Sequence, residues 1–385
     1  MGKLKKKPLD KFDCNFIKSM NEQDDTLYKN RDKERYKLIA YLSKYMLCNF
    51  HWVEIIRRYY LDTLTGKHVF LLDENLKMEK HEHIARKDKE FIKRKVYKQK
   101  ATYPQVASVY DNCISPCTVY RLIKRESISY SINFNSHPKK YKYIYIDIDD
   151  TFINLKTHNK GMEHKCKIVH TYQDYVRNGK RFINEIKMVL VNKSHMNSKE
   201  CLNWTINQIR TVLIENYGDL SNFIIIVSGD GAKYIKTIAK AFNAQTGLDR
   251  WHLFNKIRAA FKTQALKKFA FINGDVLNKK SKKNKYAERI IQLIKDAKIN
   301  EAYKLLLKVR KVCGFYCREL NSLIAYFQHN LKSIDIWSNP TYYGTFTETF
   351  VQQLVKCHFG DVGKCYSVNI FMRILNANCL ATLYR

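Results

Sequence analysis

The sequence predicts a protein of the mixed α/β class, with a strand-rich middle and basic, helix-forming segments on both sides of it. Three observations lead to this class. In the stretch "YKYIYIDIDD", residues 141–150, Tyr and Asp residues alternate with Ile residues at every second position, which is typical of a strand. The run "NFIIIVS", residues 222–228, is apolar without alternation, which indicates a strand buried on both faces. Long stretches after residue 248 have apolar residues at helical spacing.

Composition and charge limit the class of partner. The chain has 385 residues, of which 45% are hydrophobic, and this is enough for about two or three domains with cores of their own. A formal net charge of +33 favours a polyanionic partner, with nucleic acid first and a membrane surface second. No stretch approaches the roughly 18 apolar residues that span a bilayer, and "MGKLKKKPLDKFD" lacks the apolar region of a secretory signal. We therefore expect a cytoplasmic, nucleoid-associated protein with no membrane partner.

The first hundred residues are expected to form a mostly helical, basic region. The stretch "RYKLIAYLSKYMLCNFHWVEIIRRYY", residues 35–60, is interpreted as a helix. A second helix is expected within residues 78–100, which are strongly basic. That second helix is either a solvated linker or a helix that contacts phosphates.

Residues 101–135 have the pattern of a helix-turn-helix. Val106 and Ala107 lie on a first short helix, a break follows at residues 111–115, and a second helix with a basic end begins near Ser115. A general helical hairpin would give a similar pattern. In a helix-turn-helix the second helix enters the major groove. The side chains then expected at the DNA are Ser115, Thr118, Arg121, Lys124 and Arg125.

The order of elements after residue 140 matches a ribonuclease-H-like core. The first strand is followed by two strand segments, 165–176 and 181–191, with Asn178-Gly179 as a hairpin signal between them. A helix over 197–218, the buried strand and another helix complete the order. We assign residues 140–248 to the first part of this core, 249–335 to an all-helical insertion and 336–385 to the last part. In such a core the first and fourth strands lie side by side.

Three carboxylates suggest a metal site in this core. Asp147 or Asp149 on the first strand could meet Asp230, which follows the fourth strand between two glycines. Glu348 lies in the first turns of a later helix, on the border of its buried face. Two Mg²⁺ ions roughly 3.5–4 Å apart need hard, anionic oxygen ligands of this kind. The alternatives are that Asp230 only caps the helix near Ala232 and that Glu348 only complements a helix dipole.

Four stretches in this order resemble the DDE transposases of bacterial insertion sequences and the transposase-like proteins of integrative conjugative elements, which are relatives of the Mutator-type transposases. They are "YIDIDDTFINL", "VSGDGAKYIK", "LDRWHLFNKI" and "GTFTETFVQQLVK". The resemblance places the catalytic, metal-binding acids at Asp149, Asp230 and Glu348, with Asp147 in reserve. It also matches Asp249 and His252 to an Asp-x-x-His signature, whose role is left open.

The resemblance implies a DNA transposase that binds element ends and catalyses metal-dependent DNA cleavage and strand transfer. Its cofactor would be Mg²⁺ or Mn²⁺, two ions per site, held by the three acids. Its partners would be double-stranded DNA, both terminal repeats and target, and further copies of the same chain. The alternatives are a catalytically inactive, transposase-derived DNA-binding protein and a ribonuclease-H-like nuclease.

Overall fold

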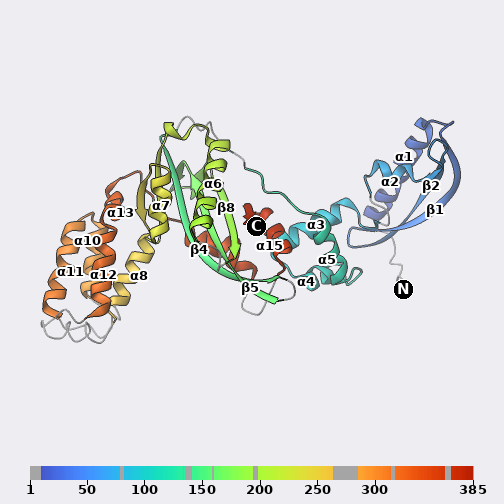
Figure 1. Cartoon of the computed structure of the whole chain (residues 1–385). Helices are drawn as coiled ribbons and strands as arrows, with labels where there is room; N and C mark the ends of the chain where they lie inside the picture. Colours follow the sequence, from blue (N-terminus) through green and yellow to red (C-terminus); the bar gives the residue numbers. More distant parts are fainter. Residues whose placement is uncertain are drawn as a thin grey trace. The chain divides into compact units, whose positions relative to one another are not determined.

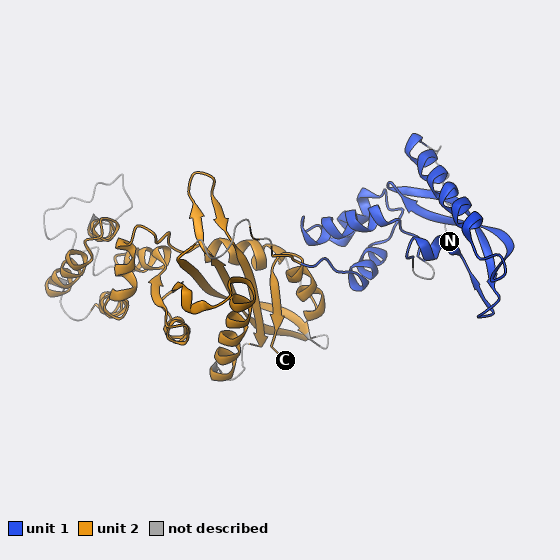
Figure 2. Ribbon diagram, turned by 90° about the horizontal axis from the view of Figure 1, so that it is seen from above, with its two compact units in different colours: residues 1–129 blue, residues 130–385 orange. Residues whose placement is uncertain are grey.

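The computed structural model describes residues 10–78, 82–132, 134, 141–157, 160–193, 198–262, 285–313, 317–359 and 366–384. The chain forms two compact units, residues 1–129 and 130–385, which have different colours in Figure 2. Each unit is described by itself.

Unit 1 contains a three-stranded antiparallel sheet, so the expectation of a mostly helical region over residues 1–100 is wrong. The strands are β1 (Tyr36–Cys48), β2 (His51–Asp62) and β3 (Lys67–Val69), in the order β1-β2-β3. The stretch interpreted as one helix is the β1–β2 hairpin. Its two loop residues, Asn49 and Phe50, have φ of 48° and 72°. Positive φ at both central residues is the geometry that matches the twist of paired strands, and Asn adopts it readily.

Helices complete unit 1. They are α1 (Lys11–Asn30), which packs on β2, then α2 (Leu71–Asn75), α3 (Arg86–Tyr97), α4 (Tyr103–Val109) and α5 (Pro116–Arg125). The expected basic helix is present as α3, and the two short helices are present as α4 and α5. Their buried residues are those expected from the spacing: Val106, Ala107, Val119, Leu122 and Ile123.

Unit 2 is built on a mixed six-stranded sheet in the order β10-β9-β4-β5-β8-β11. Its strands are β4 (Tyr143–Thr157), β5 (Lys160–Tyr172), β8 (Ile186–Lys193), β9 (Ile224–Gly229), β10 (Gln245–Leu248) and β11 (Leu380–Leu383). β4 pairs antiparallel with β5 and parallel with β9, so the predicted contact of the first and fourth strands is confirmed. Asn178-Gly179 lies in the turn of a separate hairpin, β6 (Asp174–Val176) with β7 (Arg181–Ile183).

Helices cover both faces of this sheet (Figure 1). On one face α6 (Ser198–Tyr217) and α7 (Lys233–Ala241) pack against Ile144, Ile146 and Ile148 of β4. On the other face α14 (Thr347–Phe350), a π-helical turn (Val351–Val355) and α15 (Val368–Asn376) pack against Ile153 and Leu155. The two faces of β4 therefore belong to different cores, as the alternation of its side chains predicts.

The described part of residues 249–335 is helical, as the spacing predicts. It contains α8 (Arg250–Ala260), α10 (Lys285–Lys295), α11 (Ile299–Cys313), α12 (Arg318–His329) and α13 (Leu331–Asp335), which share one core with Tyr145 and Leu248 of the sheet. Residues 263–284 of the predicted insertion lie outside the described residues. Nowhere in the described chain is a helix both long and apolar enough to cross a membrane.

Candidate functional site

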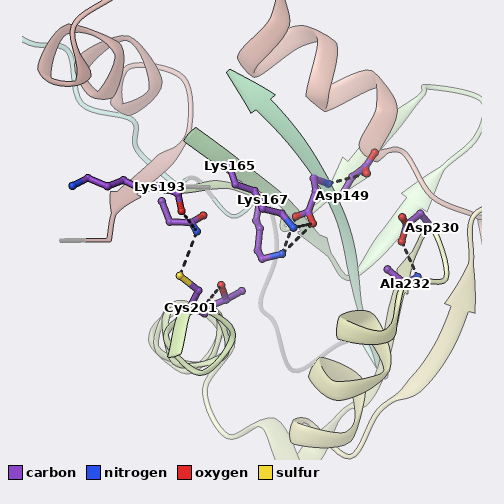
Figure 3. A network of polar contacts seen from close by, with 10 residues as sticks. Asp149, Lys165, Lys167, Lys193, Cys201, Asp230 and Ala232 are labelled. Atoms are coloured by element: carbon purple, nitrogen blue, oxygen red, sulfur yellow. Dashed lines mark hydrogen bonds and ion pairs between the residues drawn. The ribbon is translucent and has the colours of Figure 1, made fainter. Parts of the chain in front are cut away.

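The pairing of β4 with β9 brings two of the predicted acids together. The parallel register ends at Asp147 opposite Ser228. The same offset, carried two residues further, places Asp149 opposite Asp230. Gly229 permits this approach, because a Cβ atom there would lie 2.7 Å from the carbonyl oxygen of Ile148. Figure 3 shows Asp149 and Asp230 on these two neighbouring segments.

The backbone around Asp230 is held on two sides. One carboxylate oxygen of Asp230 accepts a 2.9 Å hydrogen bond from the N–H of Ala232, which is the N-cap residue of α7. The Tyr326 hydroxyl on α12 donates a 2.6 Å hydrogen bond to the Asp230 carbonyl. Gly231 has a φ of +84°, and a residue with a side chain would be strained in this conformation. Asp230 thus stabilises the turn before α7 with one of its two oxygens. The N-cap residue of α7 is Ala232, and the helix has no side-chain capping hydrogen bond, so the alternative that Asp230 caps it is wrong.

The third acid, Glu348, lies on α14, which packs against β4 and β5. Its side chain is exposed, whereas its neighbours Thr347 and Phe350 are buried. The expected position on the border of the buried face is therefore corrected to the solvent side. The helix itself continues irregularly, because a π-helical turn follows Phe350 directly.

The carboxyl of Asp149 shows that the three acids interact. Asp149 is 8% exposed, and burial raises the pKa of its carboxyl to about 6. This value already includes the lowering by the N–H of Asp150 and by the charge of His252, and smaller increases from the negative charges of Asp230 and Glu348. Three acids from β4, the β9–α7 turn and α14 therefore share one electrostatic environment.

The raised pKa of Asp149 predicts how stability depends on pH. Between pH 3.8 and about 6 the folded chain keeps a proton that the unfolded chain has released, so the free energy of unfolding falls as pH rises through this window. Asp149→Asn removes this loss. We expect the variant to be ~1–3 kcal/mol more stable than the wild type at pH 7 in EDTA, and nearly equal to it at pH 4. Urea unfolding at both pH values measures this, and an equal difference at both would contradict it.

Asp147 has a different environment from Asp149 although both lie on one face of β4. Its side chain is fully buried, and burial raises the pKa of its carboxyl. One oxygen accepts a 3.2 Å hydrogen bond from the N–H of Phe346, two residues before Glu348, and lies 3.8 Å from Nδ1 of His170. Asp147 therefore anchors the segment that leads into α14, and Asp149 is the strand acid beside Asp230.

Asp249 and His252 form a pair at the start of α8. Asp249 is the N-cap residue and accepts a 2.7 Å hydrogen bond from the N–H of Trp251. Its second oxygen lies 2.9 Å from Nδ1 of His252. This hydrogen bond raises the pKa of His252, and the charges of Asp149 and Asp230 act in the same direction. The pair thus places a basic imidazole beside the acids.

Two lysines and a fourth carboxylate, which the sequence did not single out, also lie here. Asp150 binds Lys165 at 2.7 Å and Lys167 at 2.8 Å, so its charge is balanced within the protein (Figure 3). Lys167 is nearly buried and lies over the ring of Tyr234. The only signal of this pair in the sequence was the spacing of Lys165 and Lys167, which lie two residues apart on β5. Asp150 therefore differs from Asp149, whose opposing charge is the imidazole of His252.

The predicted DNA-contacting side chains lie on α5 or at its start. Arg121, Lys124 and Arg125 are exposed. The Ser115 hydroxyl caps α5 through a 3.1 Å hydrogen bond from the N–H of Thr118, and the two hydroxyl oxygens lie 3.0 Å apart. Ser115 and Thr118 thus have structural roles in the free protein, while the exposed cations form a basic helix end.

The three acids of unit 2 do not form a tight single-ion cage. Across the described ranges, one set of three His, Cys, Asp or Glu residues has all its ligand atoms within 4.8 Å of one another, and it consists of Asp10, Asp13 and His51 in unit 1. The ligand atoms of Asp149, Asp230 and Glu348 do not all lie within this distance of one another.

Comparison with protein-family models matches residues 3–308 to a family described as "Uncharacterised protein family (UPF0236)". The matched range contains α4 and α5, Asp149, Asp230 and the Asp249–His252 pair, and it ends before Glu348. No curated protein matches the chain.

Proposed function

The chain belongs to family UPF0236, and from its site we propose that it is a DNA transposase that cleaves and joins DNA with the help of divalent metal ions. The observation that supports this most strongly is that Asp149, Asp230 and Glu348 lie close enough to interact. The charges of Asp230 and Glu348 contribute to the raised pKa of Asp149, and a cation between the three acids would offset this repulsion.

The arrangement of unit 2 supports a ribonuclease-H-like core. Its first strand, β4, lies between the antiparallel β5 and the parallel β9, and the two acids meet at the end of β9. The α4–α5 pair supports a helix-turn-helix, because two short helices with buried inner faces are joined by a six-residue turn and the second has an exposed basic end. A catalytic core with a separate DNA-reading module suits an enzyme that acts at defined DNA ends.

The residues at the site fit Mg²⁺ or Mn²⁺. The donors are carboxylate oxygens, which these hard cations prefer, and the charges of Asp230 and Glu348 act on Asp149 in the direction that a bound cation would offset. Asp149, Asp230 and Glu348 would hold the ions. When bound, such a pair of ions supplies an activated water and stabilises charge on the leaving oxygen of a phosphodiester.

The remaining side chains position the acids. Asp147 accepts a hydrogen bond from the N–H of Phe346 and so positions the segment that leads to Glu348. The hydroxyl of Tyr326 donates a hydrogen bond to the carbonyl of Asp230. Asp249 orients the imidazole of His252 through Nδ1, and this hydrogen bond raises the pKa of His252, which favours a positive charge beside the acids. In this position His252 is suited to contact a DNA phosphate or to hold a proton that cleavage releases.

DNA binding by α5 gives a separate prediction. Lys124→Ala should weaken binding about equally for all sequences and reduce the slope of log affinity against log salt by about 1, because a phosphate contact is lost. Arg121→Ala should cost ~1–3 kcal/mol on the terminal repeat and less on unrelated DNA, because a base contact is lost. Fluorescence anisotropy on both duplexes measures this. Lys29→Ala, an exposed lysine on α1, is the control, and equal losses in all three variants would contradict the role of α5.

A substrate panel separates the proposed function from its alternatives. The full chain would be incubated with duplexes of the DNA ends that flank its gene, with unrelated duplexes and with RNA–DNA hybrids, each in Mg²⁺ and in EDTA. We expect metal-dependent cleavage of the end duplexes. Preference for hybrids would indicate a ribonuclease-H-like nuclease instead, and binding without cleavage in any metal would indicate an inactive DNA-binding protein.

A further inference from the structure

A second set of ligand-type side chains lies in unit 1, at the start of α1. Asp10 is the N-cap residue of α1, Asp13 lies in its first turn, and His51 begins β2. Their ligand atoms all lie within 4.8 Å of one another. Two separate parts of the chain, the helix start and the β1–β2 hairpin, therefore bring two carboxylates and an imidazole to one place.

The two ring nitrogens of His51 have partners that fix the tautomer. Nδ1 lies 2.9 Å from the carbonyl oxygen of Asn49, which can only accept, so Nδ1 carries a hydrogen. Nε2 lies 2.5 Å from Oδ2 of Asp13, which is also an acceptor when ionised. At 2.5 Å the two atoms share a proton in a short hydrogen bond, and a metal ion that binds here would replace this proton and move the two atoms slightly apart. Metal-binding histidines commonly donate their second N–H to a backbone carbonyl in this way.

The carboxylate of Asp13 has an oxygen that no hydrogen bond within the described chain uses. Its side chain is fully buried, and Oδ2 also accepts a 3.0 Å hydrogen bond from the N–H of Asp10. Its other oxygen, Oδ1, is buried and has no hydrogen-bond partner among the described residues. A buried, ionised oxygen without a partner is costly. A proton shared between His51 and Oδ2 leaves Oδ1 without a partner in the described parts of the chain.

We propose that Asp10, Asp13 and His51 bind one divalent transition-metal ion of the Zn²⁺ class. One imidazole nitrogen and two carboxylate oxygens are ligands that Zn²⁺ accepts, with water completing a tetrahedral set. The imidazole disfavours Ca²⁺ and Mg²⁺, which prefer oxygen alone. The ion would join the start of α1 to the β1–β2 hairpin and so stabilise unit 1. This site is independent of the acids of unit 2 and of the proposed activity.

The test is a titration of the EDTA-stripped full chain with Zn²⁺, followed by calorimetry, in the wild type and three variants. Asp10→Ser removes a ligand but keeps a residue that caps helices well. His51→Gln removes the imidazole. His68→Gln is the matched control, since His68 is an exposed histidine of the same unit that stacks on Tyr59. We expect one Zn²⁺ site in the wild type and in His68→Gln, and affinity at least about 100-fold weaker in the other two.

Two further readouts distinguish this site from adventitious binding. Co²⁺ in place of Zn²⁺ should give ligand-field bands without thiolate-to-cobalt charge transfer, because the site contains no cysteine, whereas binding at exposed Cys14 or Cys117 would give it. Saturating Zn²⁺ should raise the melting temperature of the wild type but not that of Asp10→Ser. The proposal is overturned if the wild type binds no Zn²⁺. It is also overturned if Asp10→Ser and His51→Gln bind Zn²⁺ as the wild type does.

Discussion

Asp230→Asn should reduce Mg²⁺-dependent cleavage of end DNA by about 10²–10³-fold, because it removes one anionic oxygen from the acids that would hold the metal ions. The fold should be retained. Asn keeps a side-chain oxygen that can accept the hydrogen bond from the N–H of Ala232, so the start of α7 is preserved. Single-turnover cleavage of labelled duplexes and the melting temperature of the variant measure the two effects separately.

Asp219→Asn is the matched control for this variant. Asp219 accepts a 3.0 Å hydrogen bond from the N–H of Ser221, two residues on, as Asp230 does from Ala232, but it precedes β9 instead of following it. We expect its cleavage rate to equal that of the wild type. Full cleavage by a folded Asp230→Asn protein would leave Asp230 only its role in the turn before α7.

Gly229→Ala should destabilise unit 2 by ~1–3 kcal/mol, the usual cost of overpacking. The added Cβ atom would lie 2.7 Å from the Ile148 carbonyl oxygen and 2.7 Å from Cδ1 of Ile235. The first of these is backbone and cannot rotate away, so β9 would move from β4 where Asp149 and Asp230 meet. Thermal unfolding should show a fall of about 2–4 °C per kcal/mol. Cleavage should fall as well.

The control for this change is Gly161→Ala on β5 of the same sheet. A Cβ atom at Gly161 would meet nothing within 4 Å, so its melting temperature should stay near that of the wild type. A wild-type melting temperature for Gly229→Ala would show that the strands are not in close contact at this point.

The sheet of unit 2 could be predicted where side-chain pattern alone decides it. The alternation in β4 placed Ile144, Ile146 and Ile148 on one face, and the unbroken apolar run of β9 indicated a strand with neighbours on both sides. β11 was not predicted, because its four residues have no pattern of their own and join the sheet only through pairing with β8.

The prediction of secondary structure for unit 1 was wrong because the strands of this unit are unusually long and the turn between them is atypical. β1 and β2 span 13 and 12 residues, a length that also suits a helix, and the mixture of Tyr, Leu and Lys has no clear period. Asn49 is followed by Phe50 instead of the glycine that usually marks such a hairpin turn. Phe50 is held there by packing on Phe91 and Tyr110, which no local pattern reveals.

The candidate site was predictable as a set of residue types but not as a geometry. Asp147 and Asp149 lie on one face of the same strand but have different hydrogen-bond partners. Asp147 accepts a hydrogen bond from the N–H of Phe346, which is 199 positions away in the sequence. Tyr326 likewise reaches Asp230 from 96 positions away. Such contacts depend on how helices from residues 249–376 close over the sheet, which spacing along one segment cannot show.

The central claim is tested most directly by a strand-transfer assay with the wild-type chain. A duplex of the DNA end beside the gene, labelled at one strand, would be incubated with a target plasmid in Mg²⁺ and in EDTA. In Mg²⁺, and not in EDTA, we expect cleavage that leaves a 3′-hydroxyl and joining of that end to the plasmid. Stable binding of the end duplex without cleavage or joining, in Mg²⁺ and in Mn²⁺, would contradict the claim.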